Sequence, residues 1–203
     1  MSCSYNSSRI EAVAAFHGHW CPGLAIGIRA AEYAHHRFPE ASDTDLIAVV
    51  ETDMCGVDAI QFLTGCTLGK GNLIAVDIGK MAFTFFHRPS GEGFRALLDP
   101  DARGAMGEEL EKLHRQANEG ALTPEKQRRQ QELRQALQDR YMQLPLELMF
   151  RAQEPQRSMP RGPQIQQSLS CASCGEKTME SRTRLCNGQT FCIPCFQSID
   201  QKQ

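Results

Sequence analysis

Two Cys-x-x-Cys pairs near the end of the chain constrain its fold more than any other feature. Cys171 and Cys174 form the first pair, Cys192 and Cys195 form the second, and 17 residues separate Cys174 from Cys192. Four thiolates at this spacing are typical of a structural zinc site. Because so short a segment cannot bury a core, the binding energy of the metal has to replace one. The pattern predicts a zinc finger, with two short strands around the turn at Asn187-Gly188.

The chain before the finger divides into a larger core and a connecting segment. Of the 203 residues, 41% are hydrophobic, which is enough for a core in the larger part. The segment after Ala152 contains three prolines and several glutamines, follows no hydrophobic period, and is typical of a linker. We therefore expect a core domain over residues 1–152, a linker over 153–170 and the zinc finger over 171–203.

Composition also limits the location and the partners that we expect. No stretch is apolar for long enough to span a membrane, and the first residues lack the basic region and apolar run of a secretory signal, so we expect a cytoplasmic protein without membrane contact. Nine cysteines, several of them in Cys-x-x-Cys pairs, then indicate metal binding rather than disulfides. The formal net charge of −2 gives no general attraction for nucleic acid, so a nucleic-acid partner is not expected.

A second group of metal-binding residue types lies between Phe16 and Gly23. Pro22 suits the first position of a helix, which places Cys21 at or near the N-cap. The free N–H groups and the helix dipole at that position favour an anion, and a cysteine there tends to react or bind metal as the thiolate. His17 and His19 can converge on the same point if the segment is extended. The pattern predicts a shared metal or catalytic site; the alternative is that Cys21 is simply a buried small side chain and both histidines cap loops.

Further polar residues follow a buried strand. The apolar run over residues 46–51 predicts this strand, and Asp53, Cys55 and Asp58 come directly after it, where α/β-type sheets place chemistry. The glycine-rich segment 64–72 then carries Cys66 and Lys70 but lacks the spacing of a phosphate-binding loop. The remaining elements are expected to be helices over 8–16, 22–38, 59–63, 94–98 and 108–118, a helix starting at Pro124 with Thr123 as N-cap, an antiparallel hairpin of 73–77 with 81–87, and a final strand within 145–152.

These residues suggest one core site with defined roles. The candidate metal ligands are His17, His19, Cys21, Cys55 and Cys66, three or four of which would make a tetrahedral nitrogen and sulfur site for zinc. A missing protein ligand would leave a position for water or substrate. The candidate catalytic residues are Cys21 as a nucleophile, Asp53 and Asp58 as groups that orient histidines or exchange protons, and Lys70 as a partner for an anion. The alternative is a closed metal site or a thiol-rich core without turnover.

Several motifs in order resemble the FmdE family of formylmethanofuran dehydrogenase proteins. The segments that carry the resemblance are His17–Gly27, Glu51–Cys55 with Asp58–Gln61, Gly65–Asn72 and Asp77–Lys80, and it extends over about residues 8–152. It implies an α+β core, with an antiparallel or mixed sheet flanked by helices, and a C-terminal treble-clef zinc finger. It also implies a homodimer and a groove lined by cysteine and histidine that can hold a metal ion, for which zinc is the expected choice.

Three functions follow as hypotheses. The family name implies a metal-binding subunit or accessory protein of the molybdenum or tungsten enzyme that reduces carbon dioxide to the formyl level in methanogenesis, although such a name does not establish a catalyst. The second hypothesis is an independent zinc or thiolate hydrolase or transferase. The third is a nucleic-acid or transcription-linked protein that uses the finger. The small basic excess of residues 151–203, seven Lys and Arg against four Asp and Glu, argues against the third.

Overall fold

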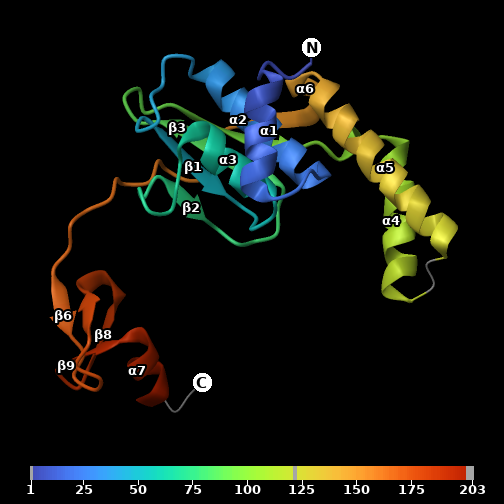
Figure 1. Cartoon of the computed structure of the whole chain (residues 1–203). Coiled ribbons are helices and arrows are strands. Elements are labelled where there is room, and N and C mark those ends of the chain that lie inside the picture. Colours follow the sequence, from blue (N-terminus) through green and yellow to red (C-terminus); the bar gives the residue numbers. More distant parts are fainter. Residues whose placement is uncertain (1, 121–122, 200–203) are drawn as a thin grey trace. The chain divides into compact units, whose positions relative to one another are not determined.

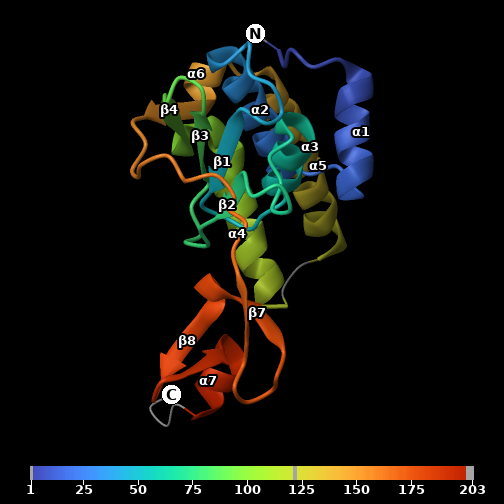
Figure 2. The same cartoon turned by 90° about the vertical axis from the view of Figure 1, so that its left-hand side faces the viewer.

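The computed structural model describes residues 2–120 and 123–199, and the chain forms two compact units, Met1–Gly162 and Pro163–Gln203 (Figures 1 and 2). The division after Gly162 lies within the expected linker. Gln153 ends a strand of the first unit, and Ser168–Ser170 forms a strand of the second, so both ends of that segment are paired in sheets.

The larger unit is built on a mixed five-stranded sheet with the order β2-β1-β3-β4-β5, which confirms the expected α+β class. Its strands are β1 (Leu46–Val50), β2 (Leu73–Ala75), β3 (Ala82–His87), β4 (Gly93–Leu98) and β5 (Phe150–Gln153). The helices are α1 (Ser7–His17), α2 (Pro22–Arg37), α3 (Gly56–Thr64), α4 (Ala105–Asn118), α5 (Pro124–Gln143) and α6 (Leu146–Met149), with a 3-10 turn η1 (Pro100–Arg103).

The interior strand β1 is buried on both faces of the sheet. Ala48 and Val50 belong to the main hydrophobic core, which also contains Ala30 and Ala34 of α2, and α1, α2 and α3 cover this face (Figure 1). Ile47 and Val49 face the other side and pack with Phe86 and Met159. Burial on both faces explains why the strand is a continuous apolar run rather than an alternating one.

The expected hairpin of residues 73–77 and 81–87 is wrong. Strand β2 pairs with β1 in parallel, with Ala48 opposite Leu73, whereas β3 pairs with the other edge of β1 in antiparallel orientation, with Ala48 opposite Phe85. The two segments are therefore separated by β1. Proximity in sequence favoured direct pairing, but the apolar strand β1 lies between the two segments and pairs with both.

The expected helix over 94–98 is also wrong, because these residues form β4. Phe94, Ala96 and Leu98 belong to the main core, and Arg95 between them is buried on the opposite face. Arg95 donates to both carboxylate oxygens of Glu51, at 2.6 and 2.7 Å. So short a run is compatible with both the helical and the strand period of apolar residues. It forms a strand because it pairs with β3 on one side and β5 on the other.

The predicted helix starts at Pro22 and Pro124 are confirmed. Thr123 is the N-cap of α5, and its side chain accepts a hydrogen bond from the Lys126 N–H. Helices α4 and α5 lie side by side as a hairpin, linked by the ion pair of Arg129 with Glu109 at 2.8 Å (Figure 1). None of the described helices combines the length and the apolar character needed to span a lipid bilayer.

The smaller unit consists of short elements around a cluster of cysteines, and it confirms the zinc-finger-like region expected at this end. The expected strands appear as β8 and β9, joined by a turn in which Asn187 and Gly188 have φ angles of 49° and 77°. Such a turn favours Asn-Gly. The elements are β6 (Ser168–Ser170), β7 (Lys177–Met179), η2 (Glu180–Arg182), β8 (Thr183–Cys186), β9 (Gln189–Cys192) and α7 (Ile193–Ile199).

Candidate metal centres

The first two helices bring His17 and Cys21 together across a short connection. His17 is the last residue of α1, and Gly18 ends that helix in the left-handed conformation with φ 92°. Cys21 has extended backbone angles and is the N-cap of α2, as expected from Pro22. Its Sγ accepts a hydrogen bond from the Leu24 N–H at 3.3 Å. The sulfur is therefore held at the N-terminus of α2 by a backbone N–H.

Cys55 reaches the same point because α2 and α3 cross at glycines. A Cβ on Gly27 would collide with the Gly56 carbonyl, so only glycine permits this approach. One turn earlier on α2, a Cβ on Gly23 would lie 3.7 Å from the Cys55 Sγ and 3.9 Å from the Cys21 Sγ. Burial and the neighbouring Cys21 thiol raise the pKa of Cys55, which metal binding would overcome.

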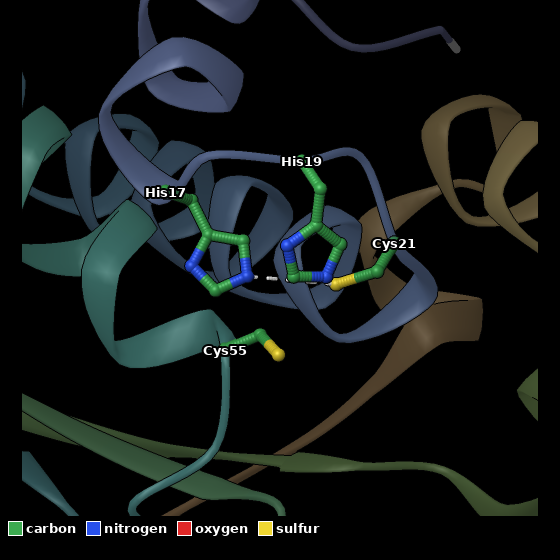
Figure 3. Close-up of side chains that lie close together, drawn as sticks. All are labelled: His17, His19, Cys21 and Cys55. Carbon is green, nitrogen blue, oxygen red and sulfur yellow. Dashed lines mark hydrogen bonds between the residues drawn. The ribbon is translucent and has the colours of Figure 1, made fainter.

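Four side chains form the core cluster, which we define as His17, His19, Cys21 and Cys55 (Figure 3). Each offers one ligand atom, and these atoms all lie within 4.8 Å of one another. His17 Nε2 is 3.9 Å from the Cys21 Sγ, while ligand atoms on tetrahedral zinc lie roughly 3.5 to 3.8 Å apart. His17 Nδ1 donates to Asp58 Oδ2 at 2.7 Å, which directs Nε2 into the cluster. The donor set fits zinc with little rearrangement.

A cavity of about 420 Å³ adjoins the core cluster, and His19, Cys21 and Cys55 form part of its lining. The opposite wall comes from α4 and α5. Apolar side chains contribute much of the surface, among them Trp20, Ile26, Met81, Leu137 and Tyr141. The volume lies in the range of sites for small molecules and cofactors. A ligand in the cavity would therefore lie directly against the metal-binding residues.

The second cluster consists of Cys171, Cys174, Cys192 and Cys195 in the smaller unit. Their sulfur atoms lie within 4.8 Å of one another, and the Cys174 and Cys192 sulfurs are 3.9 Å apart, close to the roughly 3.8 Å edge of a four-thiolate zinc site. Backbone N–H groups of Cys174 and Cys192 lower the pKa of Cys171 to about 6, so the fold itself favours one thiolate. The Cys192 side chain raises the pKa of Cys195 to about 12.

The comparisons with known proteins agree with this arrangement. The sequence family described as "FmdE, Molybdenum formylmethanofuran dehydrogenase operon" matches residues 16–151. The chain belongs to the FmdE family. The family described as "Prokaryotic dksA/traR C4-type zinc finger" matches residues 167–201, which contain the second cluster.

Two relatives extend these matches. A crystal structure of a tungsten formylmethanofuran dehydrogenase FmdE-like protein from Syntrophus aciditrophicus is similar with a TM-score of 0.62 and 26% identity, over 97% of this chain and 95% of that chain. A probable S-adenosyl-L-methionine-binding protein from Archaeoglobus fulgidus is 28% identical over 90% of this chain. The chain spans about half the length of that relative, 51%. These matches do not favour an independent hydrolase or transferase, or a nucleic-acid-binding protein.

Within this FmdE-family fold, some of the expected site residues lie elsewhere. Cys66 is fully buried in the main core, where its thiol donates to the Leu46 carbonyl at 3.4 Å, so the structure does not bring it to the core cluster. Burial raises the pKa of Cys66. Asp53 and Lys70 are exposed and do not line the cavity. Asp58 does lie where an orienting carboxylate was expected, on His17.

The wall contributed by α4 and α5 was not anticipated from the sequence. His114, Arg134, Leu137, Gln138 and Tyr141 line the cavity from these two helices, more than 50 residues after Cys55. The helical period predicts which residues share a face of α5, but the partner of that face follows only from tertiary packing.

Proposed function

We propose that the core cluster binds one zinc ion and that this metal and the adjoining cavity are the functional centre of the protein. The observation that carries the proposal is the convergence of four ligand atoms within 4.8 Å, one of them on a histidine already oriented by Asp58. Two imidazoles and two thiolates suit zinc in tetrahedral geometry. We further propose that the cysteines of the smaller unit hold a second, structural zinc ion.

The protein residues prepare the centre in distinct ways. Asp58 fixes the ring of His17, and its side chain is 39% exposed whereas that of His17 is only 10% exposed. The Leu24 N–H in the first turn of α2 donates to the Cys21 Sγ and so orients this side chain. His19, Cys21 and Cys55 face the cavity, so a small molecule can approach the metal from that side. Four protein ligands fill tetrahedral zinc, so Lewis acidity toward a molecule in the cavity would require one of them, such as the exposed His19, to give up its position on the metal.

The family and the neighbour support a place beside a one-carbon oxidoreductase. The family description names the molybdenum formylmethanofuran dehydrogenase operon, and the Syntrophus protein is named for the tungsten enzyme. We propose that this chain is a metal-binding subunit or accessory protein of such a molybdenum or tungsten enzyme, and that it acts as a homodimer. The proposed role is to present a small molecule to, or accept one from, the larger enzyme.

A second candidate is the binding of S-adenosyl-L-methionine in the same cavity. The name of the Archaeoglobus relative supports it, and the cavity has the size and the mixed apolar and polar lining of a cofactor site. Calorimetric titration of the zinc-loaded protein with S-adenosyl-L-methionine tests this candidate. A titration in which the heat per injection shows no saturation would exclude binding of S-adenosyl-L-methionine.

Metal analysis by plasma mass spectrometry tests the proposed core site. We expect two zinc ions per wild-type chain and one per chain in Cys55→Ser and in His19→Ala. Cys66→Ala is the matched control, because it removes another core thiol outside the cluster, and it should retain both ions. Two ions in Cys55→Ser and His19→Ala, or one in Cys66→Ala, would contradict the assignment. Gel filtration with light scattering tests the homodimer.

A further inference from the structure

One residue that lines the cavity carries a buried polar atom for which the described residues provide no hydrogen-bond partner. Gln138 lines the cavity from α5, is only 5% exposed, and its Oε1 has no hydrogen-bond partner among the residues that the structure describes. A glutamine amide offers a donor and an acceptor side by side. Because burying such a group without partners lowers stability, most buried amides are hydrogen-bonded. Among the described residues four buried side-chain atoms lack a partner, and Gln138 Oε1 is the one whose residue lines this cavity, which points to a ligand that completes the pair.

The surroundings of Gln138 define the shape of that ligand. Leu137 and Tyr141 flank it on α5, while Trp20 and Met81 contribute to the cavity from other elements. Aromatic and thioether side chains favour flat, polarizable groups over chains of tetrahedral carbon. An apolar ring therefore fits the body of the cavity, with its polar edge turned to the Gln138 amide.

A cation lies one helical turn from Gln138 at the same cavity. Arg134 donates to His114 Nε2 at 3.1 Å, and within the described chain it has no ion pair. Arg103, which also lines the cavity, is instead paired with Glu111 at 3.2 Å. Arg134 is exposed and can turn toward an anion, and guanidinium groups bind carboxylates in a bidentate manner.

We propose that the cavity binds a small planar ring compound whose amide-type edge pairs with Gln138 and whose carboxylate pairs with Arg134. Arg134 and Gln138 lie four residues apart on α5, so their side chains leave the same face of the helix and can contact opposite ends of one substituted ring. This inference rests on the proposed function, because it assigns a ligand class to the cavity beside the core cluster. It names Gln138 as the residue that recognises the ligand.

Three simple probes separate the two contacts. 4-Carbamoylbenzoate carries both groups, benzoate lacks the amide, and benzamide lacks the carboxylate. Calorimetry on the full zinc-loaded chain at low salt should show 4-carbamoylbenzoate binding about tenfold more tightly than benzoate, the effect of one buried hydrogen-bonded pair. Its advantage over benzamide should be about threefold and should disappear at high salt, because Arg134 is exposed.

Variants assign each contact to its residue. Gln138→Leu should remove the preference for 4-carbamoylbenzoate over benzoate, and Arg134→Gln should remove the preference over benzamide. Gln135→Leu is the control: Gln135 lies on the exposed side of α5, where it donates to Asp139, and this change should leave all three affinities unaltered. Gln138→Leu should also melt at the same or a higher temperature than wild type, because it removes an unpartnered buried amide.

The outcomes distinguish this inference from the proposed function. No saturable binding of 4-carbamoylbenzoate to wild type, an unchanged preference in Gln138→Leu, or a lower melting temperature of that variant would each overturn the inference. The zinc content of the same samples is measured in parallel. Probe discrimination without a core zinc ion would support the inference and contradict the proposed function. A full zinc content without discrimination would do the reverse.

Discussion

The two cysteine-containing clusters are equally compact but are supported in opposite ways. Each has four ligand atoms within 4.8 Å of one another. In the smaller unit the buried hydrophobic cluster is Cys171, Phe191 and Cys192, so two of its three members are themselves ligands. In the larger unit the candidate ligands lie at or next to helix ends, beside a separate core that includes Phe83, Phe85 and Ile60.

This difference teaches what the metal contributes in each place. Where the ligands are the core, metal binding and folding are one event. Where a hydrophobic core holds the candidate ligands, we expect the proposed site to exist before a metal binds, which would leave the free energy of binding available for function. Substitutions in each unit test this contrast, beginning with the largest expected effect.

Cys174→Ser should unfold the smaller unit and leave the larger unit folded. Structural zinc contributes about 10–16 kcal/mol in zinc-finger peptides, far more than this unit can obtain from its few buried side chains. Amide dispersion in NMR spectra and protease cleavage after Gly162 would report the loss. Cys186→Ser is the matched control, since Cys186 lies outside the cluster, and it should keep the unit folded. A folded tail in the first variant would abolish the contrast.

Arg95→Met should destabilise the larger unit by about 3–5 kcal/mol, because it leaves the Glu51 carboxylate buried without its partner. Urea unfolding measures the change. The control is Arg151→Met, which breaks the ion pair with Asp99 at the surface and should cost no more than about 1 kcal/mol. Equal losses of stability in the two variants would show that the buried pair of Arg95 and Glu51 contributes no more than the surface pair.

The same pair predicts a dependence on pH. The Arg95 hydrogen bonds hold the pKa of Glu51 below its ordinary value. The stabilisation is therefore complete above the unfolded-state pKa of about 4.3 and is lost as the pH falls through the lower folded-state pKa. Arg95→Met should flatten the decline in stability over this acidic range. If stability falls with pH in Arg95→Met as steeply as in wild type, other carboxylates cause the acid sensitivity.

Asp58→Asn should weaken zinc binding at the core cluster about 10- to 100-fold, or about 1.4–2.7 kcal/mol, because His17 loses its charged hydrogen-bond acceptor. Competition with a chromophoric chelator measures the affinity. Asp53→Asn serves as the control, because Asp53 is exposed and lies outside the cluster. Equal losses in both variants would indicate a general charge effect instead of orientation of His17.

Cys21→Ser should lose the core zinc ion and keep nearly full stability without metal, because serine is a good N-cap. Cys21→Ala should lose the ion as well and cost about 1 kcal/mol more, since nothing then accepts from the Leu24 N–H. Thermal unfolding of the metal-free proteins separates the two. If Cys21→Ser instead unfolds the larger unit, the folding of that unit depends on metal as we expect for the smaller unit.

Local signals predicted the parts of the fold that depend on neighbouring residues. Pro22 places Cys21 at the N-cap, Thr123 starts α5, and Asn187-Gly188 forms the turn of the finger. In each case the governing contact lies within a few residues. The pairing of β2 and the strand at Phe94 were missed because they depend on the order in which distant strands pair in the sheet.

The sequence by itself determined both groups of metal-binding residue types and the starts of several helices, because these follow from ligand spacing, period and caps, while the α+β class came from the resemblance to the FmdE family. Tertiary structure alone decided which distant side chains meet. It brought Cys55 and Asp58 to His17, withdrew Cys66 into the core, and placed Gln138 at the cavity. The physical reason is that these contacts follow from how α2, α3 and α5 pack, which no local pattern encodes.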